Sequence, residues 1–114
     1  MIKRISPEET YLLRREILRK NLPQESHEFN GDFDDQTFHL GYFMEDRIVG
    51  IITVLQNGEI AQIRGMAVSE DYQGKGIGKK LVEMAEEILR EIITGMILQY
   101  ILALMDIRMV DLYI

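Results

Sequence analysis

Apolar residues recur at helical spacing between residues 77 and 92. The intervals between successive apolar positions are 4, 3, 1, 3 and 4, which places them on one stripe of an α-helix. The stripe consists of Ile77, Leu81, Met84, Ala85, Ile88 and Ile92. Charged residues fall on the other faces, so the pattern predicts an amphipathic helix with one buried side.

A second helix is predicted near the start of the chain. Ser6 suits the N-cap, Pro7 the first helical position, and Glu9 the third position of a capping box. We expect this helix to run to about Lys20, because a proline follows shortly afterwards. Residues 21–36 are polar and contain Pro and Gly, which predicts a loop.

Four segments have the pattern of β-strands: MIKRI (1–5), TFHLGYF (37–43), IVGIITVLQ (48–56) and EIAQIRGMAV (59–68). The third is apolar on both faces, so we expect it to be central and covered on both sides. MEDR (44–47) predicts a turn, and Asn57-Gly58 predicts a hairpin with a type I′ turn. The order of elements predicts one α/β or α+β domain over residues 1–114, with helices flanking a mostly antiparallel central sheet.

The composition is that of an ordinary soluble globular domain. The 114 residues are 46% hydrophobic and 28% charged, and the absence of cysteine excludes disulfides, cysteine-based metal sites and a thiol nucleophile. No secretory signal is visible at the start of the chain, so a cytoplasmic location is expected. The formal net charge is −6 without a broad basic face, so nucleic acid is not an expected partner.

The stretch YQGKGIGKKL (72–81) has three glycines and three lysines at the start of the predicted helix. Free N–H groups and the positive dipole end at a helix start bind anions, and glycine lets a ligand approach the backbone. A small-anion site is the economical interpretation; the alternative is a tight turn with Lys79 and Lys80 as solvated surface residues. A Walker A loop fails because Gln73 takes its first glycine position, and a dinucleotide fingerprint would need glycine at Lys79.

The same stretch resembles a family signature. Residues Gln73 to Gly78 match the pattern Gln/Arg-x-x-Gly-x-Gly/Ala of the GNAT superfamily of acetyl-CoA-dependent N-acetyltransferases, and residues 64–89 resemble its strand–loop–helix core. The resemblance covers roughly residues 1–93. It implies a GNAT-like acyl-CoA N-acyltransferase fold and transfer of an acetyl group from acetyl-CoA to a primary amine of a small molecule or peptide. It implies no metal.

The resemblance also implies roles for individual residues. Backbone N–H groups of the glycine stretch would hold the coenzyme A pyrophosphate, and the preceding strand would pair with the pantetheine arm and splay from the next strand to admit the thioester. The cofactor positions implied are Met66, Ala67, Val68, Gln73, Gly74, Lys75, Gly76, Ile77, Gly78 and Lys79.

Three residues are candidates for catalysis: His39, Gln62 and Arg64. Some family members use a glutamate on the strand before the glycine loop as the base, and the corresponding position here is about Gln62, which cannot accept a proton. Glu59 is nearby, in the predicted hairpin turn. With strict alternation Gln62, Arg64 and Met66 share a face, whereas a bulge would change this. His39 could act as a base near neutral pH, although a lone strand histidine is more often structural.

The resemblance places the acceptor pocket at the first helix and the loop that follows it. Five carboxylates in this loop would attract a cationic amine through their field; the alternative is a solvated, mobile loop. They are Glu25, Glu28, Asp32, Asp34 and Asp35. His27, in the same loop, is expected to be exposed.

The tail, residues 94–114, departs from the family pattern. Residues 92–105 carry no charge, but these fourteen residues are too few to span a bilayer, which needs about 20, so no membrane partner is expected. We expect Thr94-Gly95 to end the helix and MILQYILAL (96–104) to form a buried strand or a short hydrophobic helix.

We interpret the tail as a truncated or frame-shifted C-terminal quarter of the family fold. A homodimer joined through Met96–Ile114 is expected, because it would cover apolar surface and an open sheet edge. Two other functions stay open at this point. One is a coenzyme A-binding protein without turnover, and the other is an interaction protein that uses its hydrophobic tail.

Overall fold

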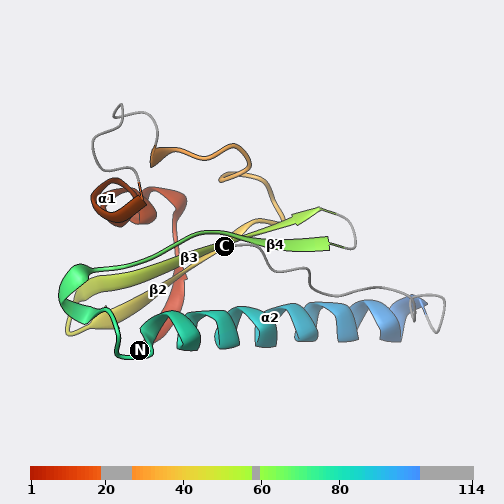
Figure 1. Ribbon diagram of the computed structural model, residues 1–114. Coiled ribbons are helices and arrows are strands. Elements are labelled where there is room, and N and C mark those ends of the chain that lie inside the picture. Colours follow the sequence, from red (N-terminus) through yellow and green to blue (C-terminus); the bar gives the residue numbers. More distant parts are fainter. Residues whose placement is uncertain (19–26, 58–59, 101–114) are drawn as a thin grey trace.

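In the described part of the chain, the centre is a four-stranded antiparallel sheet in the order β1-β2-β3-β4 (Figure 1). The computed structural model describes residues 1–18, 27–57 and 60–100. The strands are β1 (Ile2–Ile5), β2 (Phe38–Met44), β3 (Arg47–Asn57) and β4 (Ile60–Val68). The predicted strands and the predicted mostly antiparallel sheet are therefore confirmed.

Helices cover both faces of this sheet. The long helix α2 (Ile77–Tyr100) runs along one face, and the N-terminal helical segment lies over the other (Figure 1). That segment consists of the 3₁₀ turn η1 (Pro7–Thr10), α1 (Tyr11–Leu13) and the π-helical turn η2 (Arg14–Leu18). A further 3₁₀ turn, η4 (Glu70–Tyr72), lies between β4 and α2.

Strand β3 is buried on both of its faces, as its apolar sequence predicts. Ile52 and Val54 belong to the core cluster under α2, where Leu81 is also fully buried. Ile51 belongs to a second cluster, with Leu13 of α1. Each large apolar side chain buried in this way stabilises the fold by about 1.5–3 kcal/mol. The prediction of a central strand covered on both sides is confirmed.

The capping box at the first helix is formed as predicted. The Glu9 N–H donates to the Ser6 hydroxyl (3.3 Å), and the Ser6 N–H donates to the Glu9 carboxylate (2.8 Å). Hydrogen bonds to the Glu9 carboxylate from the backbone N–H of Ser6 and from its side chain lower the pKa of Glu9. The segment is helical through Leu18 but changes from 3₁₀ to α to π along its length. Its predicted end near Lys20 lies outside the described residues.

Both predicted hairpins are present. Met44 pairs with Arg47 around a two-residue turn at the predicted position, in which Glu45 has φ +53°. Asn57 pairs with Ile60 across the second hairpin. The predicted type I′ turn at Asn57-Gly58 falls partly outside the described residues.

Helix α2 is longer than predicted. The expected end at Thr94-Gly95 is wrong, because the helix continues through both residues to Tyr100. A single glycine costs a helix only about 1 kcal/mol, and no proline follows to stop the chain. The alternative of a strand from residue 96 is therefore wrong for residues 96–100, and residues 101–104 lie outside the described part.

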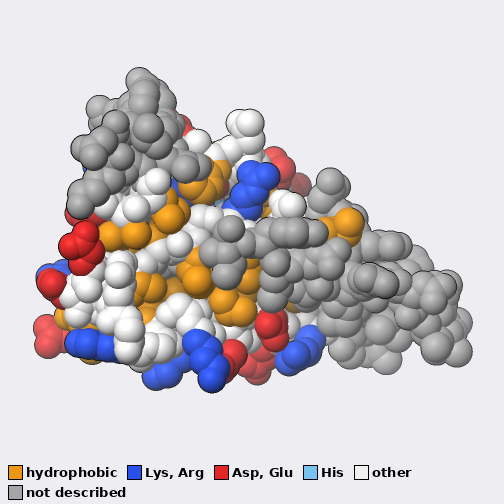
Figure 2. All heavy atoms as spheres, in the orientation of Figure 1, with side chains coloured by type: hydrophobic (Ala, Val, Ile, Leu, Met, Phe, Trp, Pro, Cys, Tyr) orange, Lys and Arg blue, Asp and Glu red, His pale blue; other side chains and the backbone are white. Residues whose placement is uncertain are grey.

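The outer face of α2 is charged. Lys79, Lys80, Glu83, Glu87 and Arg90 are exposed, and Figure 2 shows side chains of both signs along the edge where Figure 1 places this helix. Arg90 contacts Glu86 at 3.4 Å, one helical turn away. None of the helices in the described part of the chain is long and apolar enough to cross a membrane.

Candidate functional site

The glycine-rich turn leaves its backbone uncovered. Gly74 has φ +76° and Gly76 has φ +83°, a region in which L side chains are strained. A Cβ atom built at either position would meet nothing within 4 Å. Glycine therefore serves two needs here, because it permits the turn and leaves space for a ligand against the main chain.

The backbone amides of this turn point to an anion site. Among the described residues, the N–H groups of residues 74–79 donate to no carbonyl, and Lys80 makes a helical bond to the Gly76 carbonyl (3.1 Å). Free N–H groups at the start of a 24-residue helix, with the positive end of its dipole, favour a negative group. The exposed Lys75 and Lys79 add positive charge beside them.

Gln73 has a role that sequence reasoning missed. Its side-chain Nε2 donates to the Val68 carbonyl (2.9 Å), which ties the turn to the end of β4. Its backbone N–H donates to the Glu70 carbonyl (3.3 Å), so this amide is already engaged. The family pattern could have indicated this role. It allows only Gln or Arg at this position, and both have side-chain N–H donors.

A bulge in β4 decides which way its side chains point. Thr53 pairs with Arg64, but Ile51 pairs with Ala67, so β4 has one extra residue there, and Gly65 has φ +66°. Met66 packs against the α2 core cluster, whereas Ala67 joins the cluster with Leu13. The strict alternation that would place Met66 with Gln62 and Arg64 is therefore wrong.

Gln62 and Arg64 lie on the face of the sheet opposite α2. Their neighbours Ala61 and Ile63 are buried in the α2 cluster, which directs the two polar side chains to the other face. Arg64 is exposed and Gln62 is half-buried. His39, Thr53 and Arg64 form one cross-strand row over β2, β3 and β4, so the structure brings the three catalytic candidates to the same face.

His39 is engaged through both ring nitrogens. Its Nε2 is 3.0 Å from the Asp32 carbonyl oxygen, which can only accept, so Nε2 carries a proton. Its Nδ1 is 2.8 Å from the Thr53 hydroxyl. Only 3% of His39 is exposed, and this burial lowers its pKa. The geometry corresponds to the structural alternative for this residue, because the remaining lone pair is directed at Thr53.

The centre of this polar network is Arg14, a residue that sequence reasoning did not select. Arg14 is fully buried and forms a two-point ion pair with Asp32, at 2.7 and 2.9 Å. It also donates to the Thr53 hydroxyl (2.7 Å) and to the His27 carbonyl (3.0 Å). The sequence could have indicated that Arg14 is buried, because it lies between Leu13 and Ile17 on the buried stripe of the first helix.

Two expectations for the acidic loop are wrong. His27 was expected to be exposed but is buried, with 9% of its surface accessible, because its ring lies 4.5 Å from the ring of Tyr11. Asp32 is 3% exposed rather than part of a solvated loop, because Arg14 neutralises its charge. Glu28, Asp34 and Asp35 are exposed, and Glu25 lies outside the described residues.

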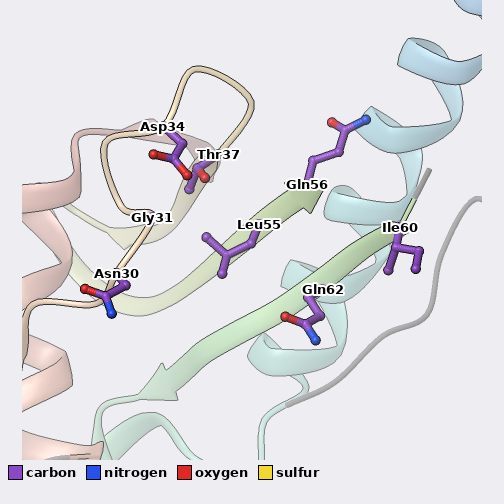
Figure 3. Close-up of a pocket in the computed structure, with 8 residues that line it drawn as sticks. All are labelled: Asn30, Gly31, Asp34, Thr37, Leu55, Gln56, Ile60 and Gln62. Carbon is purple, nitrogen blue, oxygen red and sulfur yellow. The ribbon is translucent and has the colours of Figure 1, made fainter. Parts of the chain in front are cut away.

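A cleft of about 530 Å³ lies between this loop and the hairpin ends of β3 and β4 (Figure 3). Loop residues form one wall and strand residues the other. The lining consists of Asn30, Gly31, Asp34, Thr37, Leu55, Gln56, Ile60 and Gln62. Gln62, which we expect near the position of the family's base, thus faces a space large enough for a small acceptor.

The sequence profile described as the acetyltransferase (GNAT) family matches residues 7–113. The chain belongs to the GNAT acetyltransferase family. The resemblance read from residues 73–78 is therefore confirmed. The matched range also includes most of the tail, residues 94–114, which we expected to depart from the family pattern.

Individual relatives of this GNAT protein are consistent with that assignment. It is 32% identical to the uncharacterized N-acetyltransferase YitI of Bacillus subtilis (strain 168) over 97 residues, which are 79% of this chain and 65% of the relative. The chain thus spans slightly less than two thirds of that relative's length.

Solved structures share the GNAT fold. A putative acetyltransferase from Pyrococcus horikoshii superposes with a TM-score of 0.69 at 26% identity, covering 80% of this chain and 34% of that one. An aminoglycoside 6'-N-acetyltransferase, solved in complex with coenzyme A, superposes with a TM-score of 0.62 at 15% identity, covering 82% of this chain and 56% of that one. The second likeness shows the fold alone.

Proposed function

We propose that this protein transfers an acetyl group from acetyl-CoA to a primary amine. The observation that carries the proposal is the turn before α2, with its open glycines and its amides that lack carbonyl partners in the described part of the chain. Family membership supports acetyl transfer as the reaction, and a relative named as an N-acetyltransferase supports nitrogen as the acceptor atom. The coenzyme A complex of a protein with the same fold supports the donor.

The residues present fit acetyl-CoA. Its pyrophosphate would lie against the N–H groups of Gly74–Lys79, with Lys75 and Lys79 balancing its charge. Its pantetheine arm would pair with Met66–Val68, because β4 is an edge strand among the described residues and has one side free for backbone pairing. Acetyl-CoA supplies a thioester carbonyl that an amine can attack.

None of the three catalytic candidates can remove the proton from the amine. Gln62 has no basic atom, and the His39 ring is held by Thr53 and Asp32. Arg64 is always charged, so it cannot act as a base. The ammonium must then lose its proton to solvent, or the amine must bind in its neutral form, before its nitrogen lone pair can attack the thioester carbonyl and displace coenzyme A as the thiol.

The rate of acetylation is therefore expected to rise with pH. An alkyl amine has a pKa near 10.4, so its neutral fraction grows about tenfold per pH unit below that value. Initial rates between about pH 6 and pH 9, with the product identified by mass spectrometry, measure this. A rate that stays flat over the range would contradict a reaction that proceeds without a protein base.

The test of the proposed function has two parts. Calorimetric titration with acetyl-CoA should show binding with one site per chain, and a panel of primary amines should yield at least one acetylated product. Failure of acetyl-CoA to bind the folded protein would overturn the proposal.

A second function is favoured by one observation. The glycines of the turn before α2 leave room for a cofactor, whereas Gln62, near the expected position of the family's base, accepts no proton and His39 is enclosed. A coenzyme A-binding protein without turnover would have these features. Binding of acetyl-CoA without acetylation of any amine in the panel would favour this alternative.

A further inference from the structure

The cleft shown in Figure 3 has a single charged residue in its described lining, Asp34. The opposite wall contributes Gln56 and Gln62, whose amides are neutral, together with Leu55 and Ile60. No cation lies in the lining to cancel the Asp34 carboxylate. The cleft therefore offers an acceptor one fixed negative charge, neutral hydrogen-bonding groups and an apolar strip.

The Asp34 carboxylate is available to a ligand. Its side chain is exposed and has no hydrogen bond or ion pair to another described residue. Its backbone is held in place, because the Asp34 N–H donates to Gly31 (3.1 Å) and the Thr37 N–H donates to Asp34 (3.0 Å). Asp34 thus has a fixed backbone position and, among the described residues, no partner for its charge.

Asp32, two residues earlier, shows the contrast. It is buried and neutralised by Arg14, and it also accepts a hydrogen bond from the Phe29 N–H (3.0 Å). This anchoring attaches the loop to the first helix and, through Thr53, to β3. Arg14 and Asp32 are therefore positioning residues for the loop that presents Asp34 to the cleft.

Asp34 lies on the loop wall of the cleft, opposite Gln62, near which the family's base is expected. A carboxylate that pairs with the reacting amine without accepting its proton would stabilise the ammonium form, whereas attack requires the neutral form. The same carboxylate suits a second ammonium that does not react and keeps its charge. The chemistry of the cleft thus favours an acceptor with two amines over an acceptor with one.

We propose that Asp34 is a specificity-determining residue that selects a diamine-type acceptor by binding its non-reacting ammonium. This inference rests on the proposed function for the identity of the reaction. An acceptor that carries a carboxylate at the same distance from its amine is disfavoured, because its charge repels that of Asp34.

The experiment compares three ligands of similar length: cadaverine with two ammonium groups, pentylamine with one, and aminocaproate with an ammonium and a carboxylate. Binding of each is followed by NMR titration of the protein without acetyl-CoA, and acetylation of each is followed as kcat/KM with acetyl-CoA, both at low ionic strength. The variants are Asp34→Asn and, as a matched control, Asp35→Asn, which removes the same charge from an adjacent exposed residue outside the cleft lining.

The single ammonium of pentylamine can itself pair with Asp34, so cadaverine and pentylamine should bind the native chain with similar affinity and aminocaproate should bind more weakly. In kcat/KM, cadaverine should exceed pentylamine about fivefold, the effect of one partly exposed ion pair that leaves the other amine to react. Asp34→Asn should weaken amine binding and abolish the kcat/KM preference, and Asp35→Asn should keep both. Equal losses in both variants would show a general field of the loop and overturn the proposal, as would the absence of amine binding or of the preference. Because the titration needs no acetyl-CoA, amine binding that depends on Asp34 without acetylation of any amine would contradict the proposed function and keep Asp34 as an ammonium site.

Discussion

At the scale of single residues, Gly76 has the clearest link to function. Its φ of +83° and the empty space around its Cα are both needed if a phosphate is to reach the main chain. Gly76→Glu would place a side chain and a negative charge there. We expect the affinity for acetyl-CoA to fall at least tenfold, or about 1.4 kcal/mol.

Gly76→Lys is the matched control for this substitution. It imposes the same backbone strain with a side chain of similar length but opposite charge, so the two variants should have similar free energies of unfolding. Calorimetry should show the lysine variant binding acetyl-CoA more tightly than the glutamate variant. Equal affinities of both variants and the native chain would remove the turn from the site.

The buried histidine predicts a pH dependence of stability. Burial lowers the pKa of His39 below its usual value of 6.5, so the unfolded chain takes up a proton at higher pH than the folded chain does. The contribution of His39 to the free energy of unfolding is thus complete above about pH 6.5 and decreases as the pH falls toward the lowered folded pKa. Stability should therefore decrease with acidification in this window.

Denaturant titrations at a series of pH values between about 5 and 8 measure this effect. The slope of the free energy of unfolding against pH should be smaller in His39→Gln than in the native chain. The parallel variant His27→Gln identifies which histidine causes the slope. An unchanged slope in His39→Gln would contradict the assignment.

At the scale of elements, the bulge in β4 couples the sheet to the acceptor loop. A Cβ atom at Gly65 would lie 2.5 Å from Phe29 Cε2, and Phe29 in turn has the Arg14 guanidinium 3.9 Å from its ring centroid. Phe29, Arg14 and the bulge therefore pack as one unit between the loop and β4. The direction of Met66–Val68, the proposed pantetheine strand, depends on this packing.

Gly65→Ala should be strongly destabilising. The positive φ and the clash with Phe29 together suggest a loss of about 2–4 kcal/mol in the free energy of unfolding. Gly78→Ala is the control, since its φ is ordinary and its nearest neighbour would be the flexible Met66 side chain at 3.4 Å. It should be neutral or stabilising by up to about 1 kcal/mol. Similar losses in both variants would contradict the role given to the bulge.

At the scale of the whole molecule, association of copies stays a prediction. We propose a homodimer through residues 96–114, because the uncharged stretch 92–105 would otherwise leave an apolar patch that soluble monomers rarely carry. A symmetric pairing would cover it twice. Light scattering of the full chain at tens of micromolar should give twice the mass of 13.3 kDa. A monomer under those conditions would contradict the proposal.

Much of this molecule follows from interactions between residues close in sequence. The capping box at Ser6 and Glu9, the hairpin at Asn57 and the start of α2 after the glycine turn each depend on spacing over a few positions. The apolar pattern of β3 is enough to place it at the centre of the sheet. The family is visible from Gln73 to Gly78, because binding of an anion by backbone amides constrains a short contiguous segment.

Only the tertiary structure determined which polar side chains are buried and to which face the side chains of β4 point. Arg14 and Asp32 are eighteen residues apart, so nothing local indicates that they pair and that Asp34 has no ionic partner in the described part of the chain. The bulge at Gly65 depends on contact with Phe29 and reverses the alternation expected for Met66. The burial of polar residues and the direction of side chains depend on contacts between segments that are distant in sequence. Local periodicity does not contain information about these contacts.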